Sequence, residues 1–177
     1  MKIVLLGYMG VGKTSLGRSL AEALSLNFID LDRYIENKED ASIKDIFKTK
    51  GEIYFRKIET QYLNEILEDK SDFVLSLGGG TPVYANNMSQ ISTTKNLLSI
   101  YLKLDLKILT ERLFLERQKR PLIAHYNDLN AFEEFVRKHL FERQQFYFQA
   151  DIVLEISNLN IEESKQKLIQ LVKSQNQ

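Results

Sequence analysis

The stretch GYMGVGKTSL, residues 7–16, directly follows the apolar run IVLL and decides the fold. Its first eight residues fit the pattern G-x-x-x-x-G-K-[ST], in which backbone N–H groups wrap around phosphate oxygens. Glycine permits the wrapped backbone, and a helix expected to begin near Lys13 adds the positive end of its dipole. Lys13 can reach the β- and γ-phosphates, and the Thr14 hydroxyl can ligate Mg²⁺. With a strand before it and a helix after it, this phosphate loop (residues 7–14) is predicted to hold a nucleoside triphosphate.

Length and composition narrow the class of protein. The chain has 177 residues, enough for one compact domain, and its 24 Lys and Arg balance its 24 Asp and Glu. A net charge of zero argues against nucleic-acid or membrane partners, and the absence of cysteine excludes disulfides and thiolate metal sites. The apolar start is too short for a signal peptide, and no run is long enough to span a bilayer. We therefore expect a soluble cytoplasmic protein.

Strand-like and helical segments alternate along the chain. The strand-like runs are 3–6, 27–32, 73–77, 97–102 and 151–156, and the main helical segments are Thr14–Leu26, Glu52–Glu68, Asp105–Glu116, Asn130–Phe148 and Leu159–Lys173. This alternation predicts an α/β fold with a parallel sheet covered on both faces. Two segments, 33–60 and 115–128, do not fit the alternation and are candidate covers for a ligand.

One motif suggests a different class of protein. Asn37–Asp40 matches the N-K-x-D guanine reader of GTPases. That reader follows a late strand, whereas this one follows the second, and the chain has no D-x-x-G switch. We interpret Asn37–Asp40 as a solvated turn, which disfavours a GTPase.

Two carboxylates close the second strand-like run, NFIDLD. Asp30 and Asp32 are two residues apart, so on this strand their side chains are predicted to point the same way at the carboxyl end of the sheet, where open α/β sheets bind ligands. They could serve Mg²⁺ and a substrate hydroxyl. The alternative is a role in strand-end solubility, or helix capping by Asp32.

Three further stretches each have an ordinary and a functional interpretation. Arg56 and Glu59 are i, i+3 neighbours in one helix with Gly51-Glu52, so Glu59 could orient the guanidinium or form a surface pair. Gly78–Gly80 ends the third strand, either for close approach to a ligand or for a tight turn. The stretch RQKRPL, residues 117–122, is either a charged helix end stopped by proline or a cationic flap over phosphates.

In their order and spacing, these residues resemble the shikimate kinase family along the whole chain. The shared motifs are the phosphate loop, F-I-D-x-D, G-E-x-x-F-R-x-x-E, L-G-G-G, R-P-L and a late Glu142-Arg143. The resemblance implies a P-loop kinase fold of the nucleoside monophosphate kinase type, with a five-stranded parallel sheet flanked by helices. The single domain, 1–177, would carry a substrate-binding helical insertion at 33–60 and a lid at about 112–125.

The resemblance also implies ligands and roles. The substrates would be ATP and shikimate, with Mg²⁺ held by Thr14 and, through water, by Asp30. Nucleotide contacts are expected from Gly10, Val11, Gly12, Lys13, Thr14, Ser15, Arg112 and Arg120. Shikimate contacts are expected from Asp32, Arg56, Gly78, Gly79, Gly80 and Arg143. Lys13, Asp32 and Arg120 would be catalytic, and Asp32 could take the proton of the attacking hydroxyl.

The adenine contacts are the part least defined by the resemblance. Arg112 is our choice for the arginine near adenine, with Arg117 as the alternative. Several relatives place an arginine in a late loop where this chain has Ser157-Asn158-Leu159.

Arg143 stands out from the sequence pattern as well. It lies on an apolar helical stripe with Phe132, Val136, Leu140 and Tyr147, where an arginine needs a partner or a water-lined cleft. That partner could be an acid on the insertion or the carboxylate of shikimate.

The implied reaction is transfer of the γ-phosphoryl group of ATP to the 3-hydroxyl of shikimate, a step of aromatic amino-acid biosynthesis, by a monomer. One alternative is another small-metabolite kinase such as gluconate kinase. Another is a nucleotide-binding module without turnover, although binding alone would not require Asp32.

Overall fold

Five parallel strands form the centre of the molecule: β1 (Lys2–Leu6), β2 (Asn27–Asp30), β3 (Phe73–Ser76), β4 (Leu97–Lys103) and β5 (Ile152–Glu155). The computed structural model, which describes residues 1–120 and 122–175, places them in the order β2-β3-β1-β4-β5. In this register Val4 of the central strand lies opposite Leu75 and Ser99. The predicted five-stranded parallel sheet is confirmed.

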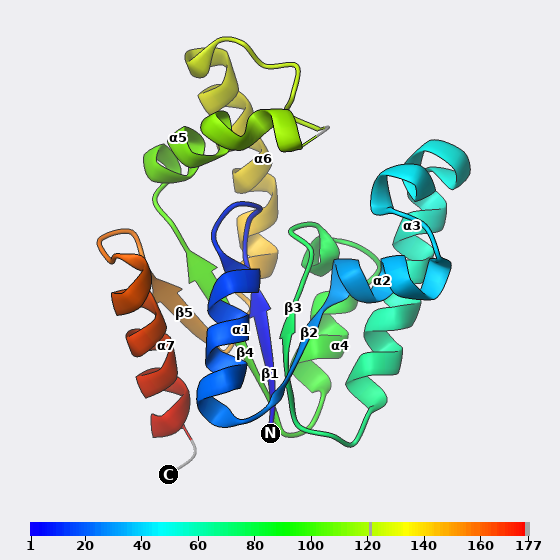
Figure 1. Cartoon of the computed structure of the whole chain (residues 1–177), viewed down its shortest axis with the longest axis vertical. Coiled ribbons are helices and arrows are strands. Elements are labelled where there is room, and N and C mark those ends of the chain that lie inside the picture. Colours follow the sequence, from blue (N-terminus) through cyan, green and yellow to red (C-terminus); the bar gives the residue numbers. More distant parts are fainter. Residues whose placement is uncertain (121, 176–177) are drawn as a thin grey trace.

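Helices cover both faces of the sheet. They are α1 (Lys13–Leu24), α2 (Leu31–Glu39), α3 (Ile43–Glu68), α4 (Asn87–Thr93), α5 (Leu106–Glu116), α6 (Leu129–Tyr147) and α7 (Ile161–Ser174), with 3₁₀ turns η1 (Thr81–Val83) and η2 (Arg117–Lys119). Figure 1 shows α1 and α7 side by side, and α3 beside α4. Above the sheet, α5 with the upper part of α6 stands on one side of the phosphate loop, and α2 with the start of α3 stands on the other.

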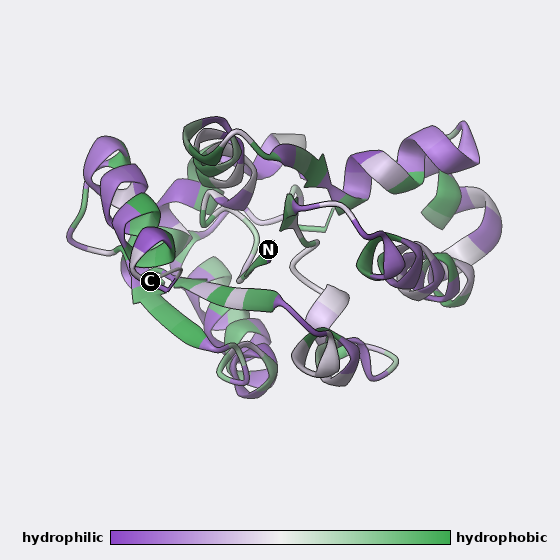
Figure 2. Ribbon diagram, turned by 90° about the horizontal axis from the view of Figure 1, so that it is seen from below, coloured by the Kyte–Doolittle hydropathy of each residue, from purple (hydrophilic) through white to green (hydrophobic). Residues whose placement is uncertain are grey.

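The core consists of the strands and the inner sides of the helices. Residues Ile3–Leu6 and Phe73–Leu75 are completely buried, as expected for strands covered on both faces. Figure 2 shows mainly hydrophobic strands in the middle of the molecule, whereas the helices mix hydrophilic with hydrophobic residues. Within the described part of the chain, every helix is too short or too polar to cross a membrane.

The second strand is shorter than predicted. It ends at Asp30, whose side chain accepts a hydrogen bond from the backbone N–H of Arg33 at 3.3 Å and so caps α2. Asp32 therefore lies in the first turn of a helix rather than on the strand. The prediction that Asp30 and Asp32 point the same way along one strand was wrong, because capping by Asp30 starts the helix two residues earlier.

Two helical segments also differ from the predictions. Gly51 does not continue a helix into Glu52, because its φ of 81° and ψ of 172° produce a kink that divides α3. Asn37–Asp40 is not a free turn: it forms the end of α2, and Asp40 caps the helix with a φ of 49°. The short helix α4 was not predicted.

Candidate active site

A cavity of about 480 Å³ opens at the carboxyl edge of the sheet. Its walls come from the phosphate loop, the ends of β2 and β3, α5 and the segment between β5 and α7. Of the predicted site residues, those in its lining are Gly10, Val11, Gly12, Lys13, Thr14, Ser15, Asp30, Asp32, Gly78, Gly79, Arg112 and Arg120. Parallel sheets bind their ligands at this edge.

Glycines give the phosphate loop its shape. Gly7, Gly10 and Gly12 have φ values of 142°, 79° and 102°, which other residues rarely adopt. Space is restricted as well, since a Cβ atom on Gly7 would lie 2.6 Å from the carbonyl oxygen of Leu102. On Gly10 it would lie 2.6 Å from the Leu113 side chain. The loop therefore depends on glycine for both its conformation and its packing against β4 and α5.

Lys13 carries a buried charge inside the loop. Its Nζ donates hydrogen bonds to the carbonyl oxygens of Gly7 at 2.9 Å and Tyr8 at 3.0 Å. Burial lowers the pKa of Lys13 to about 8, while Asp32 and Asp30 oppose this shift. The ammonium group is thus still largely protonated at neutral pH and lies where phosphate oxygens would bind.

Thr14 and Asp30 form one polar site at the start of α1. The Thr14 hydroxyl donates to Asp30 Oδ2 at 2.8 Å, while the other oxygen of Asp30 caps α2. A hydroxyl and a carboxylate oxygen are the hard ligands that Mg²⁺ prefers. In the described residues no three His, Asp or Glu side chains gather into a metal cluster.

Asp32 is exposed to the cleft but surrounded by acidic groups. The enclosing protein raises the pKa of its carboxyl to about 6, and Asp30, Glu59 and Glu36 raise it further, against the opposing effect of Lys13. Such a carboxylate is ionised at neutral pH yet close enough to its pKa to accept a proton.

Gly78–Gly80 joins three parts of the site. A Cβ atom on Gly78 would lie 3.1 Å from Asp32 Oδ1, and one on Gly79 would lie 3.1 Å from the backbone nitrogen of Met9. On Gly80 it would lie 2.9 Å from Arg56 Nη1. The glycine run therefore allows a carboxylate, the phosphate loop and a guanidinium to approach the same piece of backbone.

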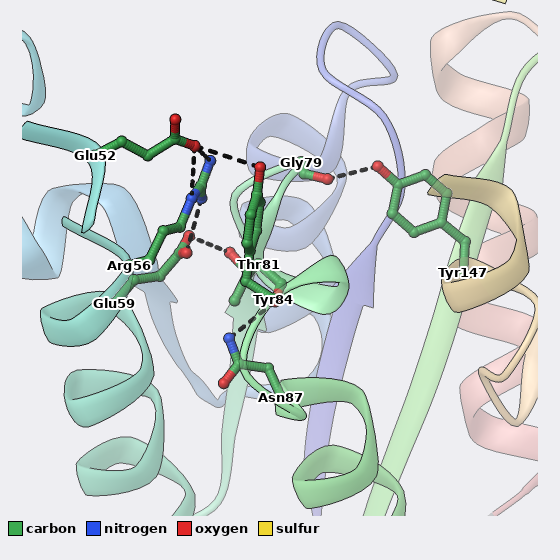
Figure 3. A network of polar contacts seen from close by, with 8 residues as sticks. All are labelled: Glu52, Arg56, Glu59, Gly79, Thr81, Tyr84, Asn87 and Tyr147. Atoms are coloured by element: carbon green, nitrogen blue, oxygen red, sulfur yellow. Dashed lines mark hydrogen bonds and ion pairs between the residues drawn. The ribbon is translucent and has the colours of Figure 1, made fainter. Parts of the chain in front are cut away.

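Arg56 belongs to a buried polar network (Figure 3). Its Nη1 donates to Glu59 Oε2 at 2.8 Å, and Glu59 Oε1 accepts a hydrogen bond from the Thr81 hydroxyl at 2.7 Å. The side chain of Glu59 is only 1% exposed. The interpretation of Arg56 and Glu59 as an ordinary surface pair is therefore wrong.

Arg143 lies on α6, beside the phosphate loop. Its side chain is 12% exposed, its Nη1 donates to the carbonyl oxygen of His139 at 3.0 Å, and Glu142 is 3.8 Å away. Across residues 1–120 and 122–175, no acid of the 33–60 segment pairs with it. The hydroxyl of Tyr8 contacts His139 Nδ1 at 2.6 Å, so α6 is linked to the loop. Burial and Arg143 lower the pKa of His139 to about 4, which leaves the imidazole neutral.

Arg56, Gly80 and Arg143 are the predicted site residues outside the lining of the 480 Å³ cavity. Gly80 and Arg56 continue from the Gly78–Gly79 wall. A hydrogen bond of 2.5 Å from Tyr147, on α6, to the Gly79 carbonyl oxygen fixes this wall on its other side (Figure 3). Tyr147 had been predicted only as part of an apolar stripe.

The three arginines of the predicted lid differ in their surroundings. Arg112 lines the cavity and donates to the Gly10 carbonyl oxygen at 3.2 Å. Arg117 instead stacks on the ring of Phe114, 4.0 Å from its centroid, outside the lining. The geometry thus favours Arg112 for contact with the nucleotide. Arg120 lines the cavity and pairs with Glu116 at 3.3 Å, while Pro121, expected to stop this segment, lies outside the described residues.

An apolar wall lines one end of the cavity, and sequence reasoning had named only Leu159 of it, as part of the late loop Ser157-Asn158-Leu159. It consists of Leu104, Ile156, Leu159 and Ile161, together with Ser164. These residues follow β4 and β5, where apolar side chains just after a strand were the available signal. Such a wall suits the flat face of a base.

A phosphate loop after the central strand, a cavity at the carboxyl edge and helical covers on both sides define a P-loop kinase. The shikimate kinase family model matches residues 9–173. The shikimate kinase of Flavobacterium johnsoniae is 40% identical over 171 residues, which cover 97% of this chain and 98% of that protein. The chain therefore belongs to the shikimate kinase family.

Solved structures agree with this assignment. The shikimate kinase of Bacteroides thetaiotaomicron superposes with a TM-score of 0.86 at 33% identity and covers 98% of both chains. The Acinetobacter baumannii shikimate kinase, in complex with shikimate, gives a TM-score of 0.82 at 33% identity, over 98% of this chain and 93% of that one. The predicted resemblance and fold class are both confirmed.

Proposed function

We propose that this chain transfers the γ-phosphoryl group of ATP to the 3-hydroxyl of shikimate, giving shikimate 3-phosphate and ADP. The observation that carries the proposal is one cavity that joins Lys13, the Thr14–Asp30 pair and Asp32 in a member of this family. Phosphoryl transfer needs alignment and charge neutralisation more than covalent help from the protein.

The phosphate loop and the lid would divide the neutralisation between them. Lys13 meets the β- and γ-phosphates from inside the loop, and Arg120 approaches the transferring group from η2. Arg112 and the apolar wall hold the rest of the nucleotide. Mg²⁺, when bound at Thr14 and Asp30, neutralises charge on the phosphate oxygens.

Asp32 would orient the acceptor. Its carboxylate accepts the hydrogen bond of the attacking hydroxyl and can receive its proton. Gly79 would contact the ring of shikimate, and the guanidinium groups of Arg56 and Arg143 would bind its carboxylate. Segment 33–60 would act as the substrate-binding insertion and about 112–125 as the lid, which excludes water during transfer.

Coupled ADP release, measured with ATP and Mg²⁺ and with shikimate, gluconate or no acceptor, tests the proposal. We expect release to depend on shikimate. Dependence on gluconate instead would indicate the other small-metabolite kinase, and no release with either acceptor would indicate a binding module. A cytoplasmic location and a monomeric state stay predictions.

The role of Arg143 can be tested separately. Within the described residues, no acid of the 33–60 insertion pairs with it. Truncating one side of a desolvated charge pair costs about 2–5 kcal/mol, which is roughly 30- to several-thousand-fold. Arg143→Ala should therefore raise the KM for shikimate steeply and leave the KM for ATP unchanged. Wild type should reject the methyl ester of shikimate, and the variant should reject it much less. A variant that loses stability but still rejects the ester would make Arg143 structural.

A further inference from the structure

Tyr84 covers the guanidinium group of Arg56. The centre of the guanidinium lies 4.0 Å from the ring centroid, the geometry of a cation–π contact. The hydroxyl of Tyr84 contacts Glu52 Oε1 at 3.3 Å, which is a weak hydrogen bond. In Figure 3 the ring stands beside the guanidinium with its hydroxyl toward Glu52. The ring face, rather than the hydroxyl, is therefore the main contact.

A rigid turn holds Tyr84 in this position. Ala85 and Asn86 adopt left-handed conformations, with φ of 50° and 63°, and reverse the chain directly after it. Asn87 is completely buried, and its backbone N–H donates to the Tyr84 carbonyl oxygen at 3.0 Å. Its side chain donates to the Thr81 carbonyl oxygen at 2.9 Å (Figure 3). The ring is thus part of a fixed wall rather than a loose surface side chain.

The other contacts of Arg56 leave its orientation incomplete without the ring. Glu59 binds only Nη1, and Glu52 approaches Nε and Nη2 at 3.4 Å with a side chain that is 56% exposed. One strong ion pair fixes a position but still allows the guanidinium plane to turn. The backbone of Gly80 and the ring of Tyr84 restrict that rotation. A second ring, that of Phe55, is more distant, with its centroid 5.1 Å from the guanidinium centre against 4.0 Å for Tyr84. Two-point binding of a carboxylate needs such a fixed plane.

We propose that Tyr84 is a positioning residue, which holds the plane of Arg56 so that the guanidinium presents its N–H groups to the carboxylate of the acceptor. This inference rests on the proposed function, in which Arg56 binds that carboxylate. Tyr84 acts through Arg56 and needs no contact with the substrate. Its loss should therefore weaken acceptor binding and leave the nucleotide and the transfer step largely unaffected.

The test compares two substitutions at this position. Tyr84→Leu removes the ring, and we expect the KM for shikimate to rise roughly 3- to 30-fold, the range of a partly desolvated cation–π contact. The kcat and the KM for ATP should stay within about threefold. Tyr84→Phe keeps the ring and loses only the weak bond to Glu52, so its KM should stay within about twofold of wild type. The preference for shikimate over its methyl ester should fall in the Leu variant and be restored in the Phe variant.

Phe28→Leu is the matched control, because Phe28 lies 5.6 Å from the guanidinium of Arg18, outside the cleft. It should leave the KM for shikimate unchanged.

A Tyr84→Leu protein with normal KM and ester preference would overturn the proposal, as would equal losses in the Leu and Phe variants. Tyr84→Met serves if the Leu variant does not fold, and failure of both to fold would make the ring structural. Wild-type enzyme without shikimate-dependent ADP release would overturn the proposed function itself, a separate result.

Discussion

Lys13 and Arg120 line the same cavity, but the protein holds them in opposite ways. Lys13 is buried and donates to two carbonyl oxygens of its own loop. Arg120 is 34% exposed, and its partner is Glu116, one turn back at 3.3 Å. Exposed pairs of this kind contribute at most about 1 kcal/mol, so Arg120 can leave Glu116 at little cost.

The difference separates two tasks within one site. A charge that must meet the phosphates on arrival is best fixed in advance, since fixed groups need no reorganisation during the reaction. A charge that closes over the transferring group must move, so that substrates can enter and products can leave. We therefore expect substitutions in the phosphate loop to have larger effects than those in the lid.

The largest effect is expected from Lys13→Met, which keeps the apolar stem and removes the fixed charge. Turnover should fall about 10³- to 10⁵-fold, the range found when a principal phosphate-neutralising cation is lost. ADP release at saturating substrates measures the effect, and thermal melting tests whether the loop still folds. Lys103→Met removes a lysine that pairs with Glu155 outside the cavity and should keep full turnover. A Lys13→Met enzyme within about tenfold of wild type would contradict the fixed-charge role.

Asp32→Asn should have the next largest effect. The substitution keeps the shape and removes the charge that orients or deprotonates the hydroxyl, so kcat should fall about 10²- to 10⁴-fold. The KM for ATP should change little, because the Thr14–Asp30 pair remains. If ATP affinity changes most, Asp32 belongs to the metal site and the assignment is wrong.

Much of the fixed part of the site, meaning the phosphate loop with Lys13 and the two aspartates Asp30 and Asp32, could be predicted from the sequence. The phosphate loop depends on glycines and a lysine in consecutive positions, so local spacing is enough to identify it. The element that carries Asp32 was harder to predict, because capping of α2 by Asp30 decides where the strand ends. Both aspartates were expected at the edge of the sheet and line the cavity there, Asp30 from the end of β2 as predicted and Asp32 from α2 instead of the strand.

The arginines of the lid and the apolar wall of the cavity were harder to predict from the sequence. Arg112 and Arg117 look equivalent in sequence, and only packing on Phe114 removes Arg117 from the cavity. Ile156 and Leu159 meet the cavity because β5 lies next to β4, which is a long-range pairing. The stacking of Tyr84 on Arg56 likewise joins residues from different elements. No local pattern encodes the last two contacts, which join residues far apart in the sequence.

Arg120→Lys tests the movable charge and should have a smaller effect than Lys13→Met. The ammonium keeps the charge but loses the planar fork, so we expect kcat to fall about 10- to 100-fold with little change in either KM. Arg137→Lys alters a similar pair, with Glu133 one turn away on the surface of α6, and should be neutral. An unaltered kcat in Arg120→Lys would leave the arginine as an ordinary solvated helix end.

The smallest expected effect is on stability: the ionised carboxylate of Asp32 should lower the free energy of unfolding. The pKa of Asp32 is about 6 in the folded protein, whereas its ordinary value, expected in the unfolded chain, is 3.8. As pH rises, the unfolded chain therefore releases this proton first. The carboxylate therefore destabilises the fold above about pH 6, and below about pH 4 the cost disappears. Because water reaches Asp32 and screens its charge, the effect on the free energy of unfolding is limited to about 1 kcal/mol, or roughly 2–4 °C in melting temperature.

Asp32→Asn should consequently melt higher than wild type at about pH 7.5, and the gap should close near pH 4. The matched control is Asp69→Asn, because the backbone N–H of Ser71 lowers the pKa of the Asp69 carboxyl. A lowered pKa stabilises the folded state at neutral pH, so the Asp69 variant should melt at or below the wild-type temperature. If Asp32→Asn also melts lower at neutral pH, the ionised carboxylate stabilises the fold. In that case the burial of Asp32 and its proximity to Asp30 and Glu59 would not destabilise the folded protein, contrary to this prediction.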